Sequence, residues 1–230
     1  MEKKVYAVIL AGGHGQRMGA SVPKQFLPLD GKPILRHTVE KFLSLGREVE
    51  IITVIPSDGR EYWKRYCEES GFLQRYIMPT GGITRFHSVQ NALKYVPDGA
   101  VVAVHDGVRP FVEPDFLNTL IDEAEQNDAV IPVIPPVESV RTLETDGSSF
   151  AVDRSRYVLV QTPQVFKSEI LKKAYAQPYS PAFTDDASVV EAAGFKVKLV
   201  PGSRNNIKLT TPEDLSLAEA ICRISKKDNL

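Results

Sequence analysis

Cationic side chains accompany a glycine-rich loop near the start of the chain. The loop follows an apolar run that ends at Leu10, and it contains Ala11, Gly12, Gly13, Gly15, Arg17 and Gly19; Lys24 follows within Pro23-Lys24-Gln25. Glycines let backbone N–H groups approach a phosphate closely, and fixed cations neutralise its charge. The segment therefore predicts a site for the phosphates of a nucleoside triphosphate.

Two common phosphate-binding loops do not fit this segment. A dinucleotide fingerprint needs a third Gly or Ala where this chain has Met18, and no acidic residue ends a second strand at the expected place. A Walker A loop needs Gly-Lys-Ser/Thr at the start of a helix, and this segment contains no such run. A flexible glycine turn would explain two of the glycines but neither Arg17 nor Lys24.

A carboxylate stands in a second position suited to chemistry. Asp106 directly follows the apolar run Ala100–His105. Open α/β sheets bind ligands beyond the carboxyl ends of their strands, and Mg²⁺ prefers one or two carboxylates together with phosphate oxygens and waters. Asp106 is therefore the expected metal ligand, with a cap on the turn before Gly107 as the structural alternative.

Apolar β-branched runs alternate with segments of helical period, and this pattern positions both features. We expect an α/β fold with a Rossmann-like, mostly parallel sheet and helices on both faces. The expected strands are Val5–Leu10, Glu50–Ile55, Tyr76–Pro79, Ala100–His105, Ala129–Val133, a strand through Leu159, and Lys196–Val200. The expected helices are one behind Pro33, then Asp58–Glu69, Thr84–Tyr95, Pro114–Gln126, Ser168–Ala176, Asp185–Ala193 and Pro212–Ile224.

The alternation breaks after Pro135-Pro136. Residues Glu138–Val152 alternate around Glu144-Thr-Asp146-Gly147, which is a hairpin signal. We expect a single domain over residues 1–230 with a projecting β-arm at 137–155. Because an arm cannot bury both of its faces on its own domain, it predicts a closed homodimer.

Composition excludes several other classes of protein. The 230 residues include 28 Lys+Arg and 29 Asp+Glu, and a net charge of -1 argues against a nucleic-acid partner. Cys67 and Cys222 are far apart, which fits a reducing compartment without disulfides or thiolate metal sites. The short apolar run before Gly12 is neither a signal peptide nor a membrane span, so we expect a cytoplasmic protein with no membrane partner.

The loop and the residues after it resemble a known family. The run G-G-x-G-x-R-M-G followed by P-K-Q is similar to the signature loop of nucleotidyltransferases that couple a nucleoside triphosphate to a sugar phosphate. Six further motifs follow in order: Gly81-Gly82-x-x-Arg85-x-x-Ser88-Val89, Val104-His105-Asp106-x-x-Arg109-Pro110, Val152-Asp153-Arg154, Gln161-Thr162-Pro163-Gln164, Thr184-Asp185-Asp186-Ala187-Ser188 and Asn206-Ile207-Lys208. Together they resemble the 2-C-methyl-D-erythritol 4-phosphate cytidylyltransferases of non-mevalonate isoprenoid biosynthesis.

The resemblance implies a transferase that joins CTP to a polyol phosphate and releases pyrophosphate, with Mg²⁺ or another divalent cation as cofactor. It implies that Ala11, Gly12, Gly13, Gly15, Gly81, Gly82, Ser88 and Asp106 bind the nucleotide, with Asp106 also on the metal. Arg17, Lys24, Arg154 and Lys208 would be catalytic, and Gly107, Arg109, Ser139, Arg154, Thr162, Thr184 and Lys208 would bind the polyol phosphate. In relatives the arm serves the neighbouring subunit, so Ser139 and Arg154 would act in trans.

Three positions depart from the family pattern. Ile83 stands where the family often has an acid, Asn205 replaces a second acid before Asn-Ile-Lys, and Ser139 replaces a Thr but keeps the hydroxyl. Two other readings remain open at this point. One is a ribitol 5-phosphate cytidylyltransferase, which shares the first loop and His-Asp-x-x-Arg-Pro-Phe, and the other is a nucleotide-binding module without catalysis.

Overall fold

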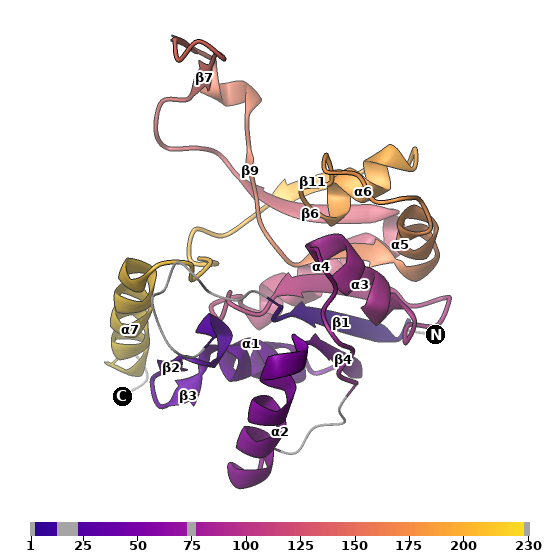
Figure 1. The fold of residues 1–230 in the computed structure, drawn as a ribbon, viewed down its shortest axis with the longest axis vertical. Coiled ribbons are helices and arrows are strands. Elements are labelled where there is room, and N and C mark those ends of the chain that lie inside the picture. Colours follow the sequence, from indigo (N-terminus) through magenta and orange to yellow (C-terminus); the bar gives the residue numbers. More distant parts are fainter. Residues whose placement is uncertain (1–2, 13–22, 73–76, 228–230) are drawn as a thin grey trace.

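A seven-stranded sheet forms the centre of the molecule (Figure 1). The computed structural model describes residues 3–12, 23–72 and 77–227. In one half of the sheet, β1 (Val5–Leu10) lies between β4 (Val49–Val54) and β5 (Val101–Asp106), and both pairings are parallel. The expected α/β class with a mostly parallel sheet is confirmed.

The other half of the sheet contains the antiparallel strands. β6 (Ala129–Ile134) pairs in parallel with β11 (Lys198–Pro201) and antiparallel with the short β9 (Leu159–Val160). β10 (Gln164–Lys167) is inserted antiparallel between β5 and β6. The sequence analysis did not predict β10, because four residues are too few to show a strand period.

Alternation along β1 explains why helices cover both faces of the sheet. Its residues 5, 7 and 9 face one core, with α1 (Ile34–Leu43), α2 (Arg60–Glu69) and α4 (Pro114–Gln126). Its residues 6 and 8 face the other core, with α3 (Arg85–Leu93), α5 (Ser168–Tyr175) and α6 (Asp186–Ala192). A strand buried on both sides must be apolar at every position, as the sequence of β1 is.

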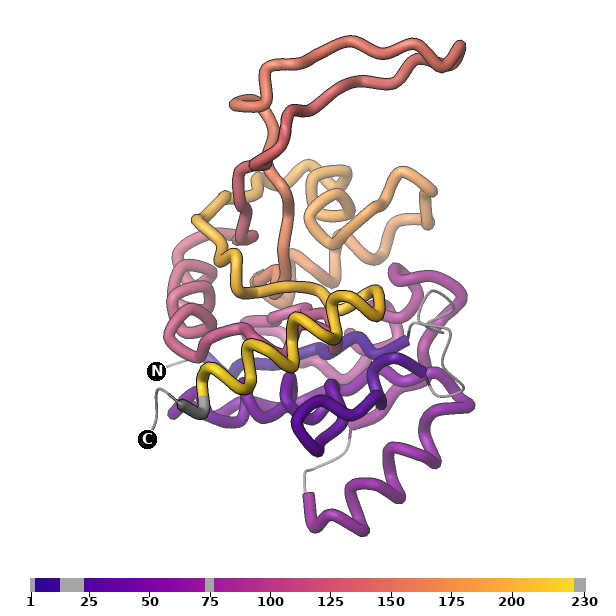
Figure 2. Tube along the Cα trace, turned by 90° about the vertical axis from the view of Figure 1, so that its left-hand side faces the viewer, coloured from indigo at the N-terminus to yellow at the C-terminus, as the bar shows by residue number. Residues whose placement is uncertain are grey.

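A smaller apolar cluster attaches the last helix. α7 (Pro212–Lys227) packs near the short hairpin of β2 (Pro28–Leu29) and β3 (Lys32–Pro33), where Leu29 and Ala218 are fully buried. Figure 2 shows α7 running along this side of the molecule. None of the helices in the described ranges is long and apolar enough to cross a membrane.

The expected strand at Tyr76–Pro79 differs from the observed structure. Tyr76 lies outside the described residues, and the part that is described makes only isolated bridges, between Ile52 and Ile77 and between Ile55 and Thr80. The helix predicted at Asp58–Glu69 begins with a 3-10 turn at Ser57–Gly59. The stop predicted at Gly194 is confirmed, since its φ of 85° is one that glycine adopts freely.

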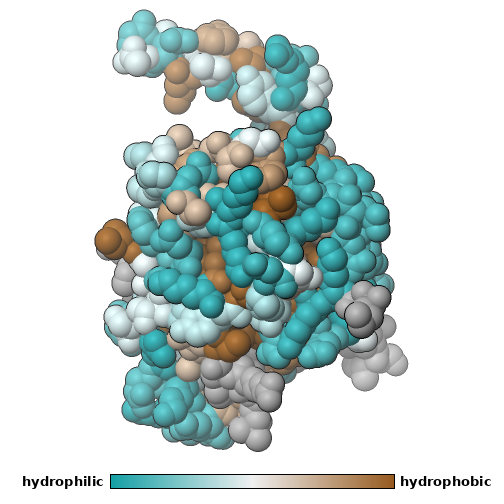
Figure 3. Space-filling view, turned by 90° about the vertical axis from the view of Figure 1, so that its right-hand side faces the viewer, coloured by the Kyte–Doolittle hydropathy of each residue, from teal (hydrophilic) through white to brown (hydrophobic). Residues whose placement is uncertain are grey.

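The arm projects away from the body in both ribbon views (Figures 1 and 2). β7 (Arg141–Leu143) and β8 (Ser149–Ala151) pair antiparallel, and Gly147 in the turn has φ 85°. A 3-10 turn at Arg154–Arg156 follows. The space-filling view shows a gap between the arm and the body below it (Figure 3). The surface of the arm carries both hydrophobic and hydrophilic residues.

Candidate active site

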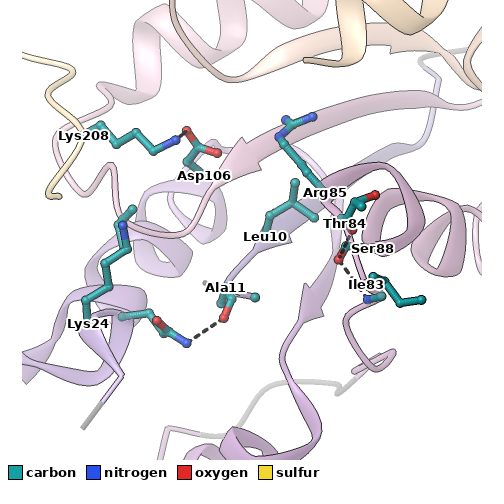
Figure 4. A pocket seen from close by; sticks show the side chains of 13 residues that line it. Leu10, Ala11, Lys24, Ile83, Thr84, Arg85, Ser88, Asp106 and Lys208 are labelled. Carbon is teal, nitrogen blue, oxygen red and sulfur yellow. Dashed lines mark hydrogen bonds and ion pairs between the residues drawn. The ribbon is translucent and has the colours of Figure 1, made fainter. Parts of the chain in front are cut away.

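A cavity of about 300 Å³ opens where β1 and β5 end and α3 begins (Figure 4). Seven of the residues expected in the site line it: Ala11, Gly12, Lys24, Gly82, Ser88, Asp106 and Lys208. Leu10, Gln25, Ile83, Thr84, Arg85 and Val108 complete the lining. The three expected residues Gly13, Gly15 and Arg17 lie outside the described part of the chain.

Backbone hydrogen bonds fix the floor of the cavity. Leu10 of β1 stands in register with Asp106 of β5, and the Gly107 N–H donates to the Leu10 carbonyl at 2.8 Å. A Cβ on Gly107 would lie 3.0 Å from that carbonyl oxygen and 3.0 Å from a methyl carbon of Leu35. Gly107 therefore allows the two strand ends to approach closely, and it does not line the cavity.

The start of the glycine loop is tied to the segment that carries Lys24. The buried side chain of Gln25 donates from Nε2 to the Ala11 carbonyl at 2.7 Å, and the Ala11 N–H donates to Val54 at 2.9 Å. Sequence reasoning quoted Gln25 in the Pro-Lys-Gln motif but gave it no role. This bond ties the Ala11 backbone to the residue that follows Lys24.

Asp106 is the centre of a charged cluster. Its Oδ2 contacts Lys208 Nζ at 3.0 Å and Arg109 Nε at 3.2 Å (Figure 4 shows Lys208). Burial by itself raises the pKa of the Asp106 carboxyl, but the positive charges of Lys208, Arg85 and Arg109 outweigh burial and hold this pKa well below its usual range. Asp106 is thus a fixed anion among cations.

Arg109 holds the backbone of the segment that carries Lys208. Its Nη1 donates to the Asn206 carbonyl at 2.7 Å, and only 11% of its side chain is exposed. Asn206 in turn donates from Nδ2 to the Thr162 carbonyl at 2.7 Å. Arg109 does not line the cavity, so in this structure it supports Lys208 and Asp106 from behind.

His105 and Thr162 form a buried hydrogen-bonded chain beneath Asp106. The Arg109 carbonyl can only accept, so His105 Nε2, at 3.2 Å, carries the ring proton, and Nδ1 accepts the Thr162 hydroxyl proton at 3.1 Å. Thr162 Oγ1 also accepts the Asp106 N–H at 3.1 Å. Because that hydroxyl proton is already used, Thr162 orients Asp106 and is not a donor toward the cavity. Burial lowers the pKa of His105 to about 4, which keeps the ring neutral.

The glycine pair before α3 makes a tight turn that its own residues hold in place. The Gly82 N–H donates to Ser88 Oγ at 3.0 Å, and the Ser88 hydroxyl donates to the Thr84 carbonyl at 3.0 Å. A Cβ on Gly82 would collide with His87 Cβ and lie 2.8 Å from the His87 carbonyl carbon. Gly81 anchors the turn through its N–H to the Ile55 carbonyl at 3.0 Å. Only glycine fits at 82, and Ser88 shapes the turn.

Besides Gly81, Gly107, Arg109 and Thr162, three further expected residues do not line the cavity. Ser139 and Arg154 lie on the arm, where Ser139 is exposed and Arg154 Nη1 donates to the Val137 carbonyl. Thr184 is exposed just before α6, and its N–H donates to Ser188 Oγ at 3.1 Å. One chain therefore brings together five of the residues expected at the nucleotide, namely Ala11, Gly12, Gly82, Ser88 and Asp106, but of those expected at the polyol phosphate only Lys208 lines the cavity.

The donor set fits a divalent cation bound together with substrate phosphates. No group of three or more metal-ligating side chains occurs among residues 3–12, 23–72 and 77–227. Mg²⁺ needs only one or two carboxylates when phosphate oxygens and waters supply the rest. Both cations contact Oδ2 of Asp106, so Oδ1 is the carboxylate atom suited to a metal.

Sequence reasoning gave no role to Arg85, although it quoted the motif that contains it. Arg85 is the first residue of α3 and lines the cavity beside Ser88 (Figure 4). Its charge acts on the Asp106 carboxyl, as described above. The spacing Gly-Gly-x-x-Arg was the available signal, but the partner of this arginine lies 101 residues away.

This arrangement defines a class of protein: an open α/β sheet whose strand ends carry a cationic, glycine-lined nucleotide site. The family model of IspD, 2-C-methyl-D-erythritol 4-phosphate cytidylyltransferase, matches residues 5–224. The chain belongs to this family.

Curated relatives and solved structures agree with the family model. The enzyme of this name from Bacteroides thetaiotaomicron is 51% identical over 218 residues, covering 95% of this chain and 99% of the relative. The enzyme from Porphyromonas gingivalis is 52% identical over 223 residues, covering 96% of this chain and 99% of the relative. The crystal structure of 4-diphosphocytidyl-2C-methyl-D-erythritol synthase from Anaerococcus prevotii has a TM-score of 0.81 at 29% identity. The match covers 96% of this chain and 99% of that structure's chain. The motif resemblance is confirmed, and the ribitol 5-phosphate alternative is not favoured.

Proposed function

We propose that the protein transfers the cytidylyl group of CTP to 2-C-methyl-D-erythritol 4-phosphate, giving 4-CDP-2-C-methyl-D-erythritol and pyrophosphate. The observation that carries this proposal is the Asp106 cluster with Lys208, at the strand ends beside Lys24 and the glycine turn, in a member of this family. A buried anion held among cations is an arrangement for phosphate chemistry. A module that only binds nucleotide would not need it.

The chemistry requires positioned charge more than a base. A phosphate oxygen of the polyol phosphate attacks the α-phosphorus of CTP, a new P–O bond forms, and the bond to the pyrophosphate leaving group breaks. A phosphate monoester has a second pKa near ~6, so the attacking group is largely dianionic at neutral pH. The protein therefore has to align two anions and stabilise the charge that develops between them.

The residues of the proposed site divide this work between two sides of the cavity. Backbone groups of Ala11 and Gly12 and the turn at Gly82 bind the nucleotide, and Lys24 holds its phosphates together with Arg17, Gly13 and Gly15. Lys208 reaches the cavity from the opposite side, with 44% of its side chain exposed, and orients the polyol phosphate. Asp106 would hold Mg²⁺ or another divalent cation, which neutralises phosphate charge when bound.

The polyol phosphate site is completed by a second subunit. Ser139 and Arg154 on the arm supply a hydroxyl and a guanidinium to the partner's cavity, while Arg109 and Thr162 support the site from within one chain. Large side chains exposed on the arm and its base support this proposal: Val137, Leu143, Phe150, Tyr157, Val158, Leu159 and Val160 are all at least 40% exposed. Residues 1–230 thus form one domain with a dimerising arm.

Pyrophosphate release tests the proposed reaction. The purified protein is incubated with CTP and Mg²⁺, and with either 2-C-methyl-D-erythritol 4-phosphate or ribitol 5-phosphate. We expect turnover with the first acceptor and at most a small rate with the second. A preference for ribitol 5-phosphate would overturn the substrate assignment, and CTP binding without pyrophosphate release from either acceptor would identify a non-catalytic module.

A further inference from the structure

Arg85 makes a two-point contact across the cavity wall. Its Nη1 donates to Asp186 Oδ1 at 2.7 Å and its Nη2 donates to Asp186 Oδ2 at 2.5 Å. Arg85 is the first residue of α3, and Asp186 is the first residue of α6. Because the planar guanidinium matches a carboxylate in this geometry, the pair fixes both the distance and the orientation of the two helix ends.

The carboxylate in this pair is fully buried and has a third partner. The Asp186 side chain is 0% exposed, and the Tyr175 hydroxyl donates to Asp186 Oδ1 at 2.6 Å. The Tyr175 ring stacks on Phe86 with centroids 4.6 Å apart, so the residue after Arg85 contacts the same cluster. Asp186 is therefore fixed from two sides, by Arg85 of α3 and by Tyr175 of α5.

The two helix ends lead to different parts of the proposed site. The start of α3 carries the glycine turn, which is held by the internal bonds of Ser88 and Gly82. The start of α6 carries Thr184 and Asp185, and Asp185 accepts from Gln164 Nε2 at 2.8 Å. Loss of the pair would thus leave the nucleotide turn with its own bonds. The start of α6 would keep its bonds to Gln164, Tyr175 and Ser188 but would lose its direct bond to α3.

Stability by itself is a poor reason to keep a charge here. Apolar side chains of similar size often replace a buried ion pair without loss of stability. Arg85 nevertheless stands at the cavity surface with 31% of its side chain exposed, where its charge also reaches Asp106. Arg85 thus has a buried partner on one side and the open cavity on the other. This placement suits a residue that aligns the two substrates.

We propose that Arg85 is a positioning residue that locks α3 to α6 through Asp186 and so sets the spacing between the nucleotide turn and the polyol-phosphate side at Thr184. The proposal rests on the proposed function, because it takes CTP and the polyol phosphate as the two ligands. Arg85 acts through Asp186, and its effect is on how the second substrate is placed against the first.

Arg85→Lys tests this role, since it keeps the positive charge but cannot bond both carboxylate oxygens. We expect the KM for 2-C-methyl-D-erythritol 4-phosphate to rise and kcat to fall, with a combined loss of roughly ten- to a hundredfold in kcat/KM, because misplaced reacting groups are costly. The KM for CTP should stay within about twofold, since the turn keeps its own bonds. Tyr175→Phe, which removes only the hydroxyl, should give the same split at a smaller size.

Arg36 provides a matched control. Arg36 donates from Nε to Glu40 Oε1 at 2.8 Å and from Nη1 to the Tyr66 hydroxyl at 3.0 Å, so it also joins a carboxylate and a tyrosine. It does not line the cavity. Arg36→Lys should leave both KM values and kcat near those of the wild-type protein. Its unfolding temperature measures how much stability is lost when an arginine that bonds a carboxylate and a tyrosine is replaced by lysine.

The outcomes separate this inference from the proposed function. Wild-type turnover supports the function whatever the Arg85 variant does, and its absence would overturn the function first. With turnover established, parameters for the polyol phosphate within twofold of wild type in both Arg85→Lys and Tyr175→Phe would overturn the positioning role. A parallel rise of both KM values in Arg85→Lys and Tyr175→Phe would overturn it as well, because a general loss of stability does not separate the two substrates.

Discussion

The cavity and the arm differ in how far their own chain covers their side chains. At the cavity, Asp106, Arg109 and Arg85 are held by partners within the same chain, and each bond has a set geometry. On the arm, Ser139 is exposed, and apolar residues such as Leu143, 77% exposed, have no cover from their own subunit (Figures 1 and 3). The difference fits the proposal that one chain organises the nucleotide site by itself, whereas a second copy covers the arm.

The largest effect should come from the cation beside the glycine loop. In the proposed mechanism Lys24→Ala removes a donor that stabilises the transition state, so kcat should fall by about 10²- to 10³-fold while the unfolding temperature is unchanged. Lys64→Ala is the control, because Lys64 is an exposed lysine that pairs with Glu68 at 3.9 Å and does not line the cavity. Steady-state kinetics measure both variants, and near-normal turnover of Lys24→Ala would remove Lys24 from the mechanism.

Mixing two impaired variants tests whether the arm works in trans. Arg154→Ala should lower kcat/KM for the polyol phosphate by at least about tenfold, because a charged hydrogen bond to the phosphate is lost. If Lys24 and Arg154 of one site come from different subunits, an equimolar mixture of Lys24→Ala and Arg154→Ala should recover about a quarter of wild-type activity after subunit exchange. A mixture no more active than the separate variants, in dimers shown to exchange, would place Arg154 in its own subunit's site.

The buried histidine should make the cavity side of the fold sensitive to acid. The folded pKa of His105 is about 4, below its ordinary 6.5, so between these pH values the unfolded chain binds the extra proton. The contribution of His105 to stability is complete above pH 6.5 and is lost as the pH falls toward 4, by about 3 kcal/mol at most. An NMR titration without divalent cation should place the midpoint of the ring near 4; a midpoint near 6.5 would contradict the hydrogen-bond assignment.

The smallest effect should come from the departure at the cavity mouth. Ile83 is 97% exposed, so restoring an acid there with Ile83→Asp should change the free energy of unfolding by less than about 0.5 kcal/mol. The preference for CTP over UTP should change by less than about threefold, because backbone groups of the turn read the base. A larger gain in selectivity would show that the acid itself contacts the nucleotide.

Features that depend on neighbouring residues in the sequence could be predicted, whereas features that depend on residues far away in the sequence could not. Helix α4 was predicted at its observed bounds, since Pro114 and a clear helical period mark it locally. β10 was not predicted, because its place between β5 and β6 depends on partners far away in the sequence. The same holds within the site, where Lys24 and Asp106 stand in local motifs but the role of Arg85 depends on Asp186.

The sequence by itself determined the fold class, the family and seven of the residues that line the cavity. These follow from local patterns: apolar periodicity, glycines where backbone must approach closely, and cations at fixed spacing from them. The tertiary structure alone decided which of those residues face the cavity and which stand behind it, as Thr162 and Arg109 do. The physical reason is that a hydroxyl proton or a guanidinium can be committed to only a few partners, and the fold chooses them from distant parts of the chain.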